Sequence, residues 1–479
     1  MSYLDNSRIL SCGELSGFTG YWSPAYTLLL IPVHFLKLNP IYCAKYLSLI
    51  IGICWSAGIY FLVWVPLAAG GIKWQNISTH CLIYPLFSCV IALLYLLSGN
   101  PLLTMTPDLL VAVFILLLIR VYSQSLTFDR LKNEFISGLI CGLGSIVKSY
   151  LIIYGFILYL FLLFIKKSRI KKFMIFIIGL CIFYSPYKII FSDNSVVRYN
   201  LYYLLVQREN QNDWGDKYLE PERERTHFWS NPTNFASTLK LNISLKQFFH
   251  AVKDNVKKDL FINFYRLPVI TFTLLALIFI NFKKMNRDDF FLIFAILLYH
   301  IGYLFLYIEE RYLFASLGIE IVLLGRLFFL SVNNFSKHCI ILRKSWIEMI
   351  VLPVFMLCWI ASYVIPASIF YLVHPVTSHH KAVQQMSGEI VLDKNIVSNN
   401  LISGFELAFL ENVKSFNVIQ FNKLKEYSEK IKENNIGYYL LSADRNFSSD
   451  DYELVNVKYY NDFGLYLYRL STSRFDNNF

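Results

Sequence analysis

Long apolar runs dominate this sequence and restrict the folds that are open to it. Ten stretches approach the length of about 20 residues that a helix needs to cross a bilayer, although some are only marginal. Of the 479 residues, 56% are hydrophobic and 16% are charged, whereas soluble domains carry roughly 25% charged residues. The chain is therefore predicted to be an α-helical polytopic membrane protein of about ten spans. The predicted spans are Tyr42–Leu67, Thr79–Leu97, Thr104–Tyr122, Glu134–Val147, Tyr150–Ile165, Phe173–Phe191, Ile262–Phe282, Phe290–Tyr307, Tyr312–Val332 and Trp346–Val373.

The fourth and fifth spans form one continuous apolar block, which is too long for a single crossing. We divide it at Lys148–Ser149 because a charge lies near its middle. A shorter run, Tyr26–Leu36, is expected to form a helix that lies on the membrane or dips partly into it.

Basic residues in short loops predict the orientation. If the spans alternate, four basic clusters fall on one side, which should be cytoplasmic. We interpret the net charge of +11 in this way rather than as a nucleic-acid site, and no nucleic-acid partner is expected. The clusters are Lys166 to Lys172, Lys283 to Arg287, Lys337 to Lys344, and a weaker one made by Arg120, Arg130 and Lys132.

The same alternation places the polar sequence outside. We expect residues 1–41 to be part of a first extracytoplasmic loop, residues 42–373 to form the transmembrane domain, and residues 192–261 to be a long outer loop within it. Residues 374–479 are predicted to form a small α/β extracytoplasmic domain. Its expected strands are Ile396–Ser398, Tyr438–Leu441 and Leu465–Tyr468, and its expected helix is Leu424–Asn434.

The N-terminus therefore falls outside the membrane, yet Met1–Tyr21 lacks a basic start followed by an apolar run. We expect a first transmembrane helix that precedes this sequence.

Two charged residues open or join spans on the outer side. Asp108, in Thr106-Pro107-Asp108, either complements the dipole of its helix or acts on a ligand as a cation-binding or hydroxyl-orienting acid. Lys148 either extends toward the interface or binds a lipid phosphate. The glycines that precede it, Gly138, Gly142 and Gly144, favour close helix packing.

Two further polar segments are candidates. In Glu309-Glu310-Arg311-Tyr312, either an internal ion pair forms, or Arg311 and Tyr312 hold phosphate oxygens while a glutamate positions Arg311. Gly20-Tyr21-Trp22-Ser23-Pro24-Ala25-Tyr26 is either an interfacial aromatic belt that leads into a helix started by Pro24, or part of a site.

These segments together resemble the GT-C membrane glycosyltransferases of the protein O-mannosyltransferase and aminoarabinose-transferase type. GYWSPAY resembles the first outer-loop motif of that superfamily, TPDLLVAVFILLL its third or fourth span, GLICGLGSIVKS its GL…K segment and ERYLF its late Arg-Tyr turn. VSNN, GFELAFL and NNIGYYLLSADR resemble the small outer domain found in bacterial members. The match covers most of residues 1–330 and the tail.

The resemblance implies a glycosyltransferase that takes a sugar from a polyprenyl phosphate and moves it to a lipid, glycan or protein acceptor outside the bacterial inner (plasma) membrane. It implies catalytic acids at Asp5 and Asp108, and donor-phosphate binding by Lys148, Arg311 and Tyr312. Supporting roles fall to Tyr21, Trp22, Glu309 and Glu310. The family's base is expected shortly before Asp5, so we expect it to be absent here and the given chain to transfer little sugar.

No cofactor is assigned, and a divalent metal is left open. Membrane lipids are expected partners. Two other functions remain open, namely a lipid or solute transporter or flippase, and an inactive, truncated scaffold.

Overall fold

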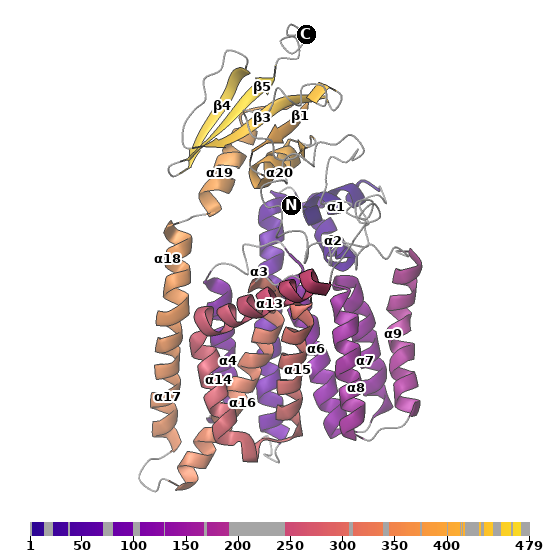
Figure 1. The fold of residues 1–479 in the computed structure, drawn as a ribbon, viewed down its shortest axis with the longest axis vertical. Coiled ribbons are helices and arrows are strands. Elements are labelled where there is room, and N and C mark those ends of the chain that lie inside the picture. The colour runs from indigo at the N-terminus through magenta and orange to yellow at the C-terminus, as the bar shows by residue number, and fades with distance from the viewer. Residues whose placement is uncertain are drawn as a thin grey trace.

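The computed structural model shows a bundle of helices that carries a small sheet at one end (Figure 1). The residues that it describes are 2–13, 23–36, 39–69, 80–98, 106–128, 130–166, 170–190, 245–305, 310–338, 344–373, 376–399, 401–411, 413, 415–416, 431–432, 435–443, 452–460 and 463–470.

Every predicted span overlaps a helix, and one stretch is interrupted by a π turn (η7, Ile360–Val364). Five of the described helices are long and apolar enough to cross a membrane, or six if a bent pair is one span. The number of crossings therefore stays a prediction. The helices are α3 (Pro40–Ala69), α4 (His80–Leu97), α6 (Asp108–Thr127), α7 (Leu131–Val147), α8 (Tyr150–Lys166), α9 (Ile170–Ile190), α14 (Pro268–Asn281), α15 (Arg287–Leu304), α16 (Phe314–His338), α17 (Lys344–Trp359) and α18 (Ile365–Val373).

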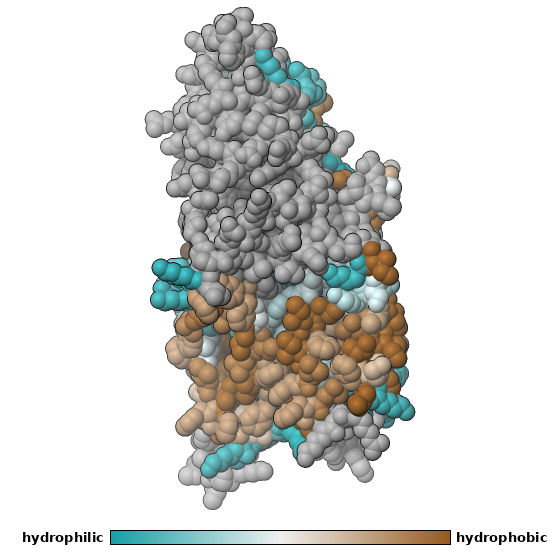
Figure 2. Space-filling view, turned by 45° about the vertical axis from the view of Figure 1, so that its right-hand side comes forward, coloured by the Kyte–Doolittle hydropathy of each residue, from teal (hydrophilic) through white to brown (hydrophobic). Residues whose placement is uncertain are grey.

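The outer surface of the bundle is apolar. Phe164 is 82% exposed and Phe279 is 87% exposed, and hydrophobic residues form a band across the face of the bundle shown in Figure 2. A helix satisfies its own backbone polar groups, which is what a hydrocarbon environment demands. The fold is that of a polytopic membrane protein.

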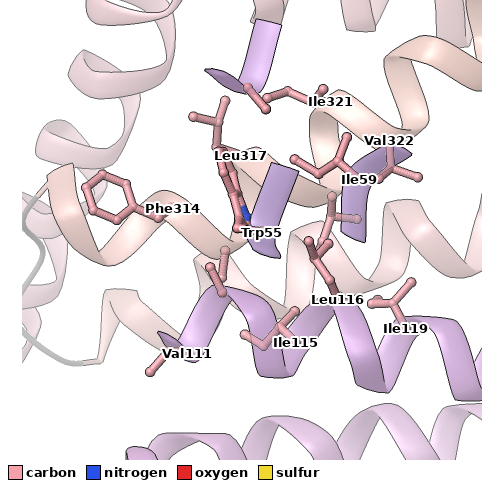
Figure 3. Close-up of a cluster of buried hydrophobic side chains, with 14 of the residues drawn as sticks. Trp55, Ile59, Val111, Ile115, Leu116, Ile119, Phe314, Leu317, Ile321 and Val322 are labelled. Atoms are coloured by element: carbon pink, nitrogen blue, oxygen red, sulfur yellow. The ribbon is translucent and has the colours of Figure 1, made fainter. Parts of the chain in front are cut away.

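The core of the bundle forms around α16. In the most apolar 18-residue window of Phe314–Asn333, 89% of the residues are buried, against 22% in that of Ile170–Ile189 in α9. Trp55 from α3 packs among apolar side chains of α6 and α16 (Figure 3). A Cβ added at Gly318 would lie 2.7 Å from the Trp55 indole nitrogen, so glycine is what admits the ring.

Helices α7 and α9 approach each other closely through glycines. A Cβ at Gly138 would lie 2.1 Å from the Phe176 carbonyl oxygen, and one at Gly142 would lie 2.4 Å from the Leu180 carbonyl oxygen. The predicted packing role of these glycines is confirmed, because two backbones can approach this closely only where no Cβ intervenes.

The predicted break between the fourth and fifth spans is confirmed. Helix α7 ends at Val147 and α8 begins at Tyr150. Lys148 between them has an extended backbone (φ −157°, ψ 124°), and its carbonyl accepts a hydrogen bond from the Leu151 amide at 2.9 Å.

The N-terminal segment contains more helix than expected. Helix α1 (Ser2–Ser11) packs on α2 (Pro24–Leu30), which a 3₁₀ turn, η2 (Ile31–Phe35), continues. Ser23 caps α2 by accepting a hydrogen bond from the Tyr26 amide at 3.3 Å. Pro24 occupies the first turn, where its missing N–H costs nothing, so the predicted proline-started helix is confirmed.

Part of the predicted outer loop 192–261 is also helical. Helix α13 (Leu245–Phe261) continues through a π turn, η4 (Ile262–Arg266), toward α14. Two shorter 3₁₀ turns, η5 (Phe282–Lys284) and η6 (Glu310–Leu313), lie at the end of α14 and before α16.

The C-terminal sheet has the strand order β2-β1-β3-β5-β4. Strand β1 pairs in parallel with β2 and β3, whereas β5 pairs antiparallel with β3 and β4. The three predicted strands are confirmed as β1, β3 and β5, while β2 and β4 were not predicted. Most of the helix predicted at Leu424–Asn434 lies outside the described residues. The elements are α19 (Val376–Ser387), β1 (Asn395–Ser398), α20 (Leu401–Leu410), β2 (Ser415–Phe416), β3 (Ile436–Ala443), β4 (Tyr452–Tyr460) and β5 (Phe463–Leu470).

The sheet and α1 occupy the same end of the bundle (Figure 1). The Arg8 guanidinium donates a hydrogen bond to the Phe409 carbonyl oxygen at 3.3 Å and lies 5.1 Å from the centre of the Phe409 ring. Helices α8, α14 and α16, which lead into basic clusters, end at the opposite end (Figure 1). Which of the two ends faces the cytoplasm stays a prediction.

Candidate functional site

A charged pair lies at the end of the bundle that carries α1, α2 and the sheet. The Lys148 ammonium donates a hydrogen bond to Asp108 Oδ1 at 2.8 Å. The Asp108 side chain is 5% exposed and that of Lys148 is 28% exposed. Asp108 is the first residue of α6, where the helix dipole favours a carboxylate. Lys148 lies in the break that follows α7, so the break is what brings the ammonium to Asp108.

Tyrosine rings surround the ammonium. Lys148 Nζ lies 4.1 Å from the centre of the Tyr312 ring and 5.7 Å from that of Tyr303. The two rings stack with their centroids 5.6 Å apart. Both ring faces attract a cation. Lys148 and Tyr312, two of the three residues predicted to bind the donor phosphate, therefore lie side by side.

Burial and charge act in opposite directions on Lys148. Burial by itself lowers the pKa of the ammonium, but the Asp108 carboxylate and the hydroxyls of Tyr303 and Tyr312 raise it above its ordinary value. Lys148 is therefore a permanent cation at neutral pH.

Hydrogen bonds from neighbouring tyrosines join α8, α15 and the backbone of the turn η6. The Tyr299 hydroxyl donates to the Tyr312 carbonyl oxygen at 2.7 Å, and the Tyr150 hydroxyl donates to the Tyr299 carbonyl oxygen at 3.2 Å. Tyr303 is 2% exposed, and its ring packs against that of Tyr299 with the centroids 5.0 Å apart.

Helices α1 and α2 lie close to this pair. The Tyr26 ring on α2 meets the Tyr3 ring on α1 edge-on at 5.3 Å, and its hydroxyl lies 3.4 Å from Ser48 Oγ. Burial raises the pKa of the Tyr26 hydroxyl, the hydrogen bond with Ser48 lowers it, and the Asp108 carboxylate raises it further.

The other predicted site residues are placed less fully. Asp5 belongs to α1, and Glu310 and Arg311 belong to η6, but their side chains lie outside the described part of the chain. The roles expected of Asp5, Glu310 and Arg311 therefore stay predictions. Tyr21, Trp22 and Glu309 lie wholly outside the described residues.

A second charged cluster was not predicted from the sequence. His300 on α15 lies between two carboxylates, with Nδ1 2.8 Å from Asp259 Oδ1 and Nε2 3.3 Å from Glu320 Oε1. All three side chains are at most 15% exposed. An ionised carboxylate only accepts hydrogen bonds, so two ionised carboxylates at these distances require a protonated imidazole. The cluster joins α13, α15 and α16.

No metal ligand set was assigned from the sequence. Within the described ranges, no group of three or more His, Cys, Asp or Glu side chains is placed to hold a metal ion.

Comparison with known proteins gives similarity in fold alone. No protein-family model matches the chain, and no curated protein sequence matches it. Two solved structures of ArnT from Cupriavidus metallidurans are similar, each with a TM-score of 0.52. The apo structure is 9% identical, and the structure bound to undecaprenyl phosphate is 10% identical. Both matches cover 98% of this chain and 93% of the other chain. The chain therefore has an ArnT-like fold over nearly its whole length.

Proposed function

We propose that this protein is a glycosyltransferase that moves a sugar from a polyprenyl-phosphate donor to a lipid, glycan or protein acceptor at the extracytoplasmic end of the bundle. The observation that carries the proposal is the cluster of Asp108, Lys148, Tyr303 and Tyr312 at one end of an otherwise apolar bundle. A similar fold binds undecaprenyl phosphate in ArnT, which supports the choice of donor.

The chemistry needs a group for each charge that develops. The acceptor hydroxyl attacks the anomeric carbon of the sugar, the bond from that carbon to the phosphate oxygen breaks, and polyprenyl phosphate leaves with the electron pair. A carboxylate takes the hydroxyl proton, and we assign this or a hydroxyl-orienting role to Asp108, with Asp5 beside it. Lys148 and Tyr312, with Arg311, stabilise the departing phosphate.

In this proposal the Lys148 ammonium has two alternative partners, the Asp108 carboxylate and the donor phosphate. In the structure Lys148 is bound to Asp108 at 2.8 Å. The donor phosphodiester carries one negative charge, as a carboxylate does, and the departing polyprenyl phosphate gains a second, so the phosphate competes for the ammonium most strongly as the bond breaks. When Lys148 turns to the phosphate, Asp108 loses its cation and becomes a better proton acceptor. Donor binding would thus activate the acid.

The test separates donor binding from transfer. Lys148→Ala should weaken binding of a polyprenyl-phosphate sugar about 10- to 100-fold, because a charge-assisted hydrogen bond is lost. Asp108→Asn should bind the donor as well as or better than the parent chain, since the competitor for Lys148 is gone, yet transfer should fall about 10²-fold or more. Binding is measured by titration in detergent, and transfer with radiolabelled donor and a mixture of membrane acceptors.

Lys284→Ala is the matched control, because it removes an exposed lysine at the opposite end of the bundle. This variant should change neither donor binding nor sugar transfer. Equal donor binding in the Lys148→Ala and parent chains would overturn the phosphate assignment. Translocation of the lipid across the membrane, with no sugar transfer by the parent chain or any variant, would favour a flippase.

A further inference from the structure

Helix α13 lies across the bundle rather than along it (Figure 1). It occupies the end of the bundle that carries Lys148, and the described residues from Phe248 to Tyr265 make an angle of 88° with those from Pro268 to Lys284. If α14 crosses the membrane, as its sequence predicts, then α13 runs in the plane of the membrane surface. The sugar-transfer proposal gives α13 no role.

One face of α13 is fastened to the bundle. Ala251 is 3% exposed, and Asn255 donates a hydrogen bond to the Leu304 carbonyl oxygen at 3.0 Å. Asp259 accepts from the His300 ring at 2.8 Å. The Phe248 ring stacks on Phe305, with centroids 6.2 Å apart. These contacts set the rotation of α13 about its axis and so decide which residues face outward.

The outward face is basic. Lys246, His250, Lys253 and Lys257 follow one another at spacings of four, three and four residues, which places them in one stripe along a helix. All are exposed, with the side chains of His250 and Lys257 71% and 69% exposed. The acidic neighbour at the edge of this stripe is Asp254, which lies 3.8 Å from His250 and 3.9 Å from Lys257.

Aromatic residues continue the stripe toward the membrane-crossing segment. Phe261 and Phe264 are 50% and 40% exposed, and Tyr265 beside them is 71% exposed. An exposed phenyl ring in water is unfavourable, whereas at a bilayer interface it is buried among acyl chains and headgroups. A soluble polyanion would match the lysines but would leave these rings exposed.

We propose that the outer face of α13 is a docking surface for anionic phospholipid headgroups in the extracytoplasmic leaflet. Lys246, Lys253 and Lys257 bind the headgroup phosphates, and Phe261 and Phe264 insert beside them. The His300 cluster holds the stripe in register with the surface. This inference does not depend on sugar transfer.

Hydrogen exchange of the α13 amides tests the proposal on the whole protein in lipid nanodiscs. At low salt, exchange from residues 245–261 should be about tenfold slower in discs that contain 30% phosphatidylglycerol than in discs of phosphatidylcholine alone. Each lysine is expected to contribute about fivefold to the preference for the anionic surface. The triple variant Lys246→Gln, Lys253→Gln, Lys257→Gln should therefore lose the difference between the two lipids, as should the parent chain in 0.5 M salt.

The matched control removes the same charge elsewhere. Lys171→Gln, Lys283→Gln, Lys284→Gln lies at the opposite end of the bundle and should keep the lipid-dependent slowing in α13. The double variant Phe261→Ser, Phe264→Ser should exchange its α13 amides faster than the parent chain in both kinds of disc, because the rings no longer insert. Exchange that is equal in the two lipids, or a difference that survives in the triple variant, would refute the proposal. Equal slowing by soluble inorganic phosphate or by an acidic peptide in phosphatidylcholine discs would also refute it, because the surface would then select a soluble anion.

Discussion

At the scale of single residues, the ion pair of Asp108 and Lys148 determines how substitutions in this site will behave. The Asp108 carboxylate is 5% exposed and has the Lys148 ammonium at 2.8 Å. Removing one member of such a pair leaves a buried charge without its counter-ion, which costs about 3 kcal/mol, whereas removing both leaves none.

We therefore predict that Lys148→Met lowers the free energy of unfolding by about 3 kcal/mol, and that Lys148→Met, Asp108→Asn recovers at least half of this loss. Denaturation in a mild detergent, followed by the fluorescence of the buried tryptophans, measures both. If the loss of stability in the double variant equals the sum of the losses in Lys148→Met and Asp108→Asn, the two residues are not coupled and Lys148 has another counter-ion.

The sequence predicted these two residues separately but not their contact. Asp108 opens a span and Lys148 interrupts an apolar block, and both facts are visible in the order of residues. The contact depends on which helices are neighbours, and apolar periodicity in a membrane helix is too uniform to show that. Tyr303 was missed for the same reason, because a tyrosine in an apolar run is as typical of the interface as of a site.

At the scale of elements, the packing of α7 against α9 can be tested because two glycines of α7 have different surroundings. A Cβ at Gly138 meets the backbone of α9 at 2.1 Å, whereas a Cβ at Gly144 meets only side chains, the nearest at 3.2 Å. Backbone cannot yield without moving the helix, but a leucine side chain can change its rotamer.

Gly138→Ala should therefore destabilise the protein by about 1–3 kcal/mol, and Gly144→Ala by less than about 1 kcal/mol. Thermal unfolding in detergent compares the two with the parent chain. Similar losses at both positions would indicate that α7 and α9 do not pack through their backbones.

Helix α13 was not predicted from the sequence. Residues 192–261 were assigned to an outer loop from the alternation of the spans, and no helix was predicted within it, yet Leu245–Phe261 is helical. Its apolar and polar residues alternate with helical spacing, which indicates a helix lying on a surface. The buried partner His300 could not be assigned, because a histidine in an apolar span gives no sign of which carboxylates face it.

At the scale of the whole molecule, the sequence predicted the order of the elements better than their arrangement. Every predicted span overlaps a helix, and three of the five strands were expected. Strand β4 was missed because charged residues such as Glu453 and Lys458 interrupt its apolar pattern, as is common in an edge strand. The number of crossings depends on how deep each helix sits in lipid, and length alone cannot determine that.

The last prediction concerns the orientation of the whole bundle. The basic ends of α8, α14 and α16 lie opposite the sheet (Figure 1), and basic loops are retained in the cytoplasm. A cysteine introduced at Val391, which is 88% exposed in the tail, should react with a membrane-impermeant maleimide in intact cells. One introduced at Lys284, in η5 at the other end, should react only after the membrane is opened. Both cysteines are introduced into a chain whose native cysteines are replaced, because Cys12 is itself exposed at the end that carries α1. Restoring Cys12 alone should give the same labelling as the cysteine at Val391. Labelling of the Lys284 position from outside, with protection of the Val391 position, would invert the bundle. The Asp108–Lys148 site would then face the cytoplasm, and a donor sugar displayed on the outer leaflet could not reach it.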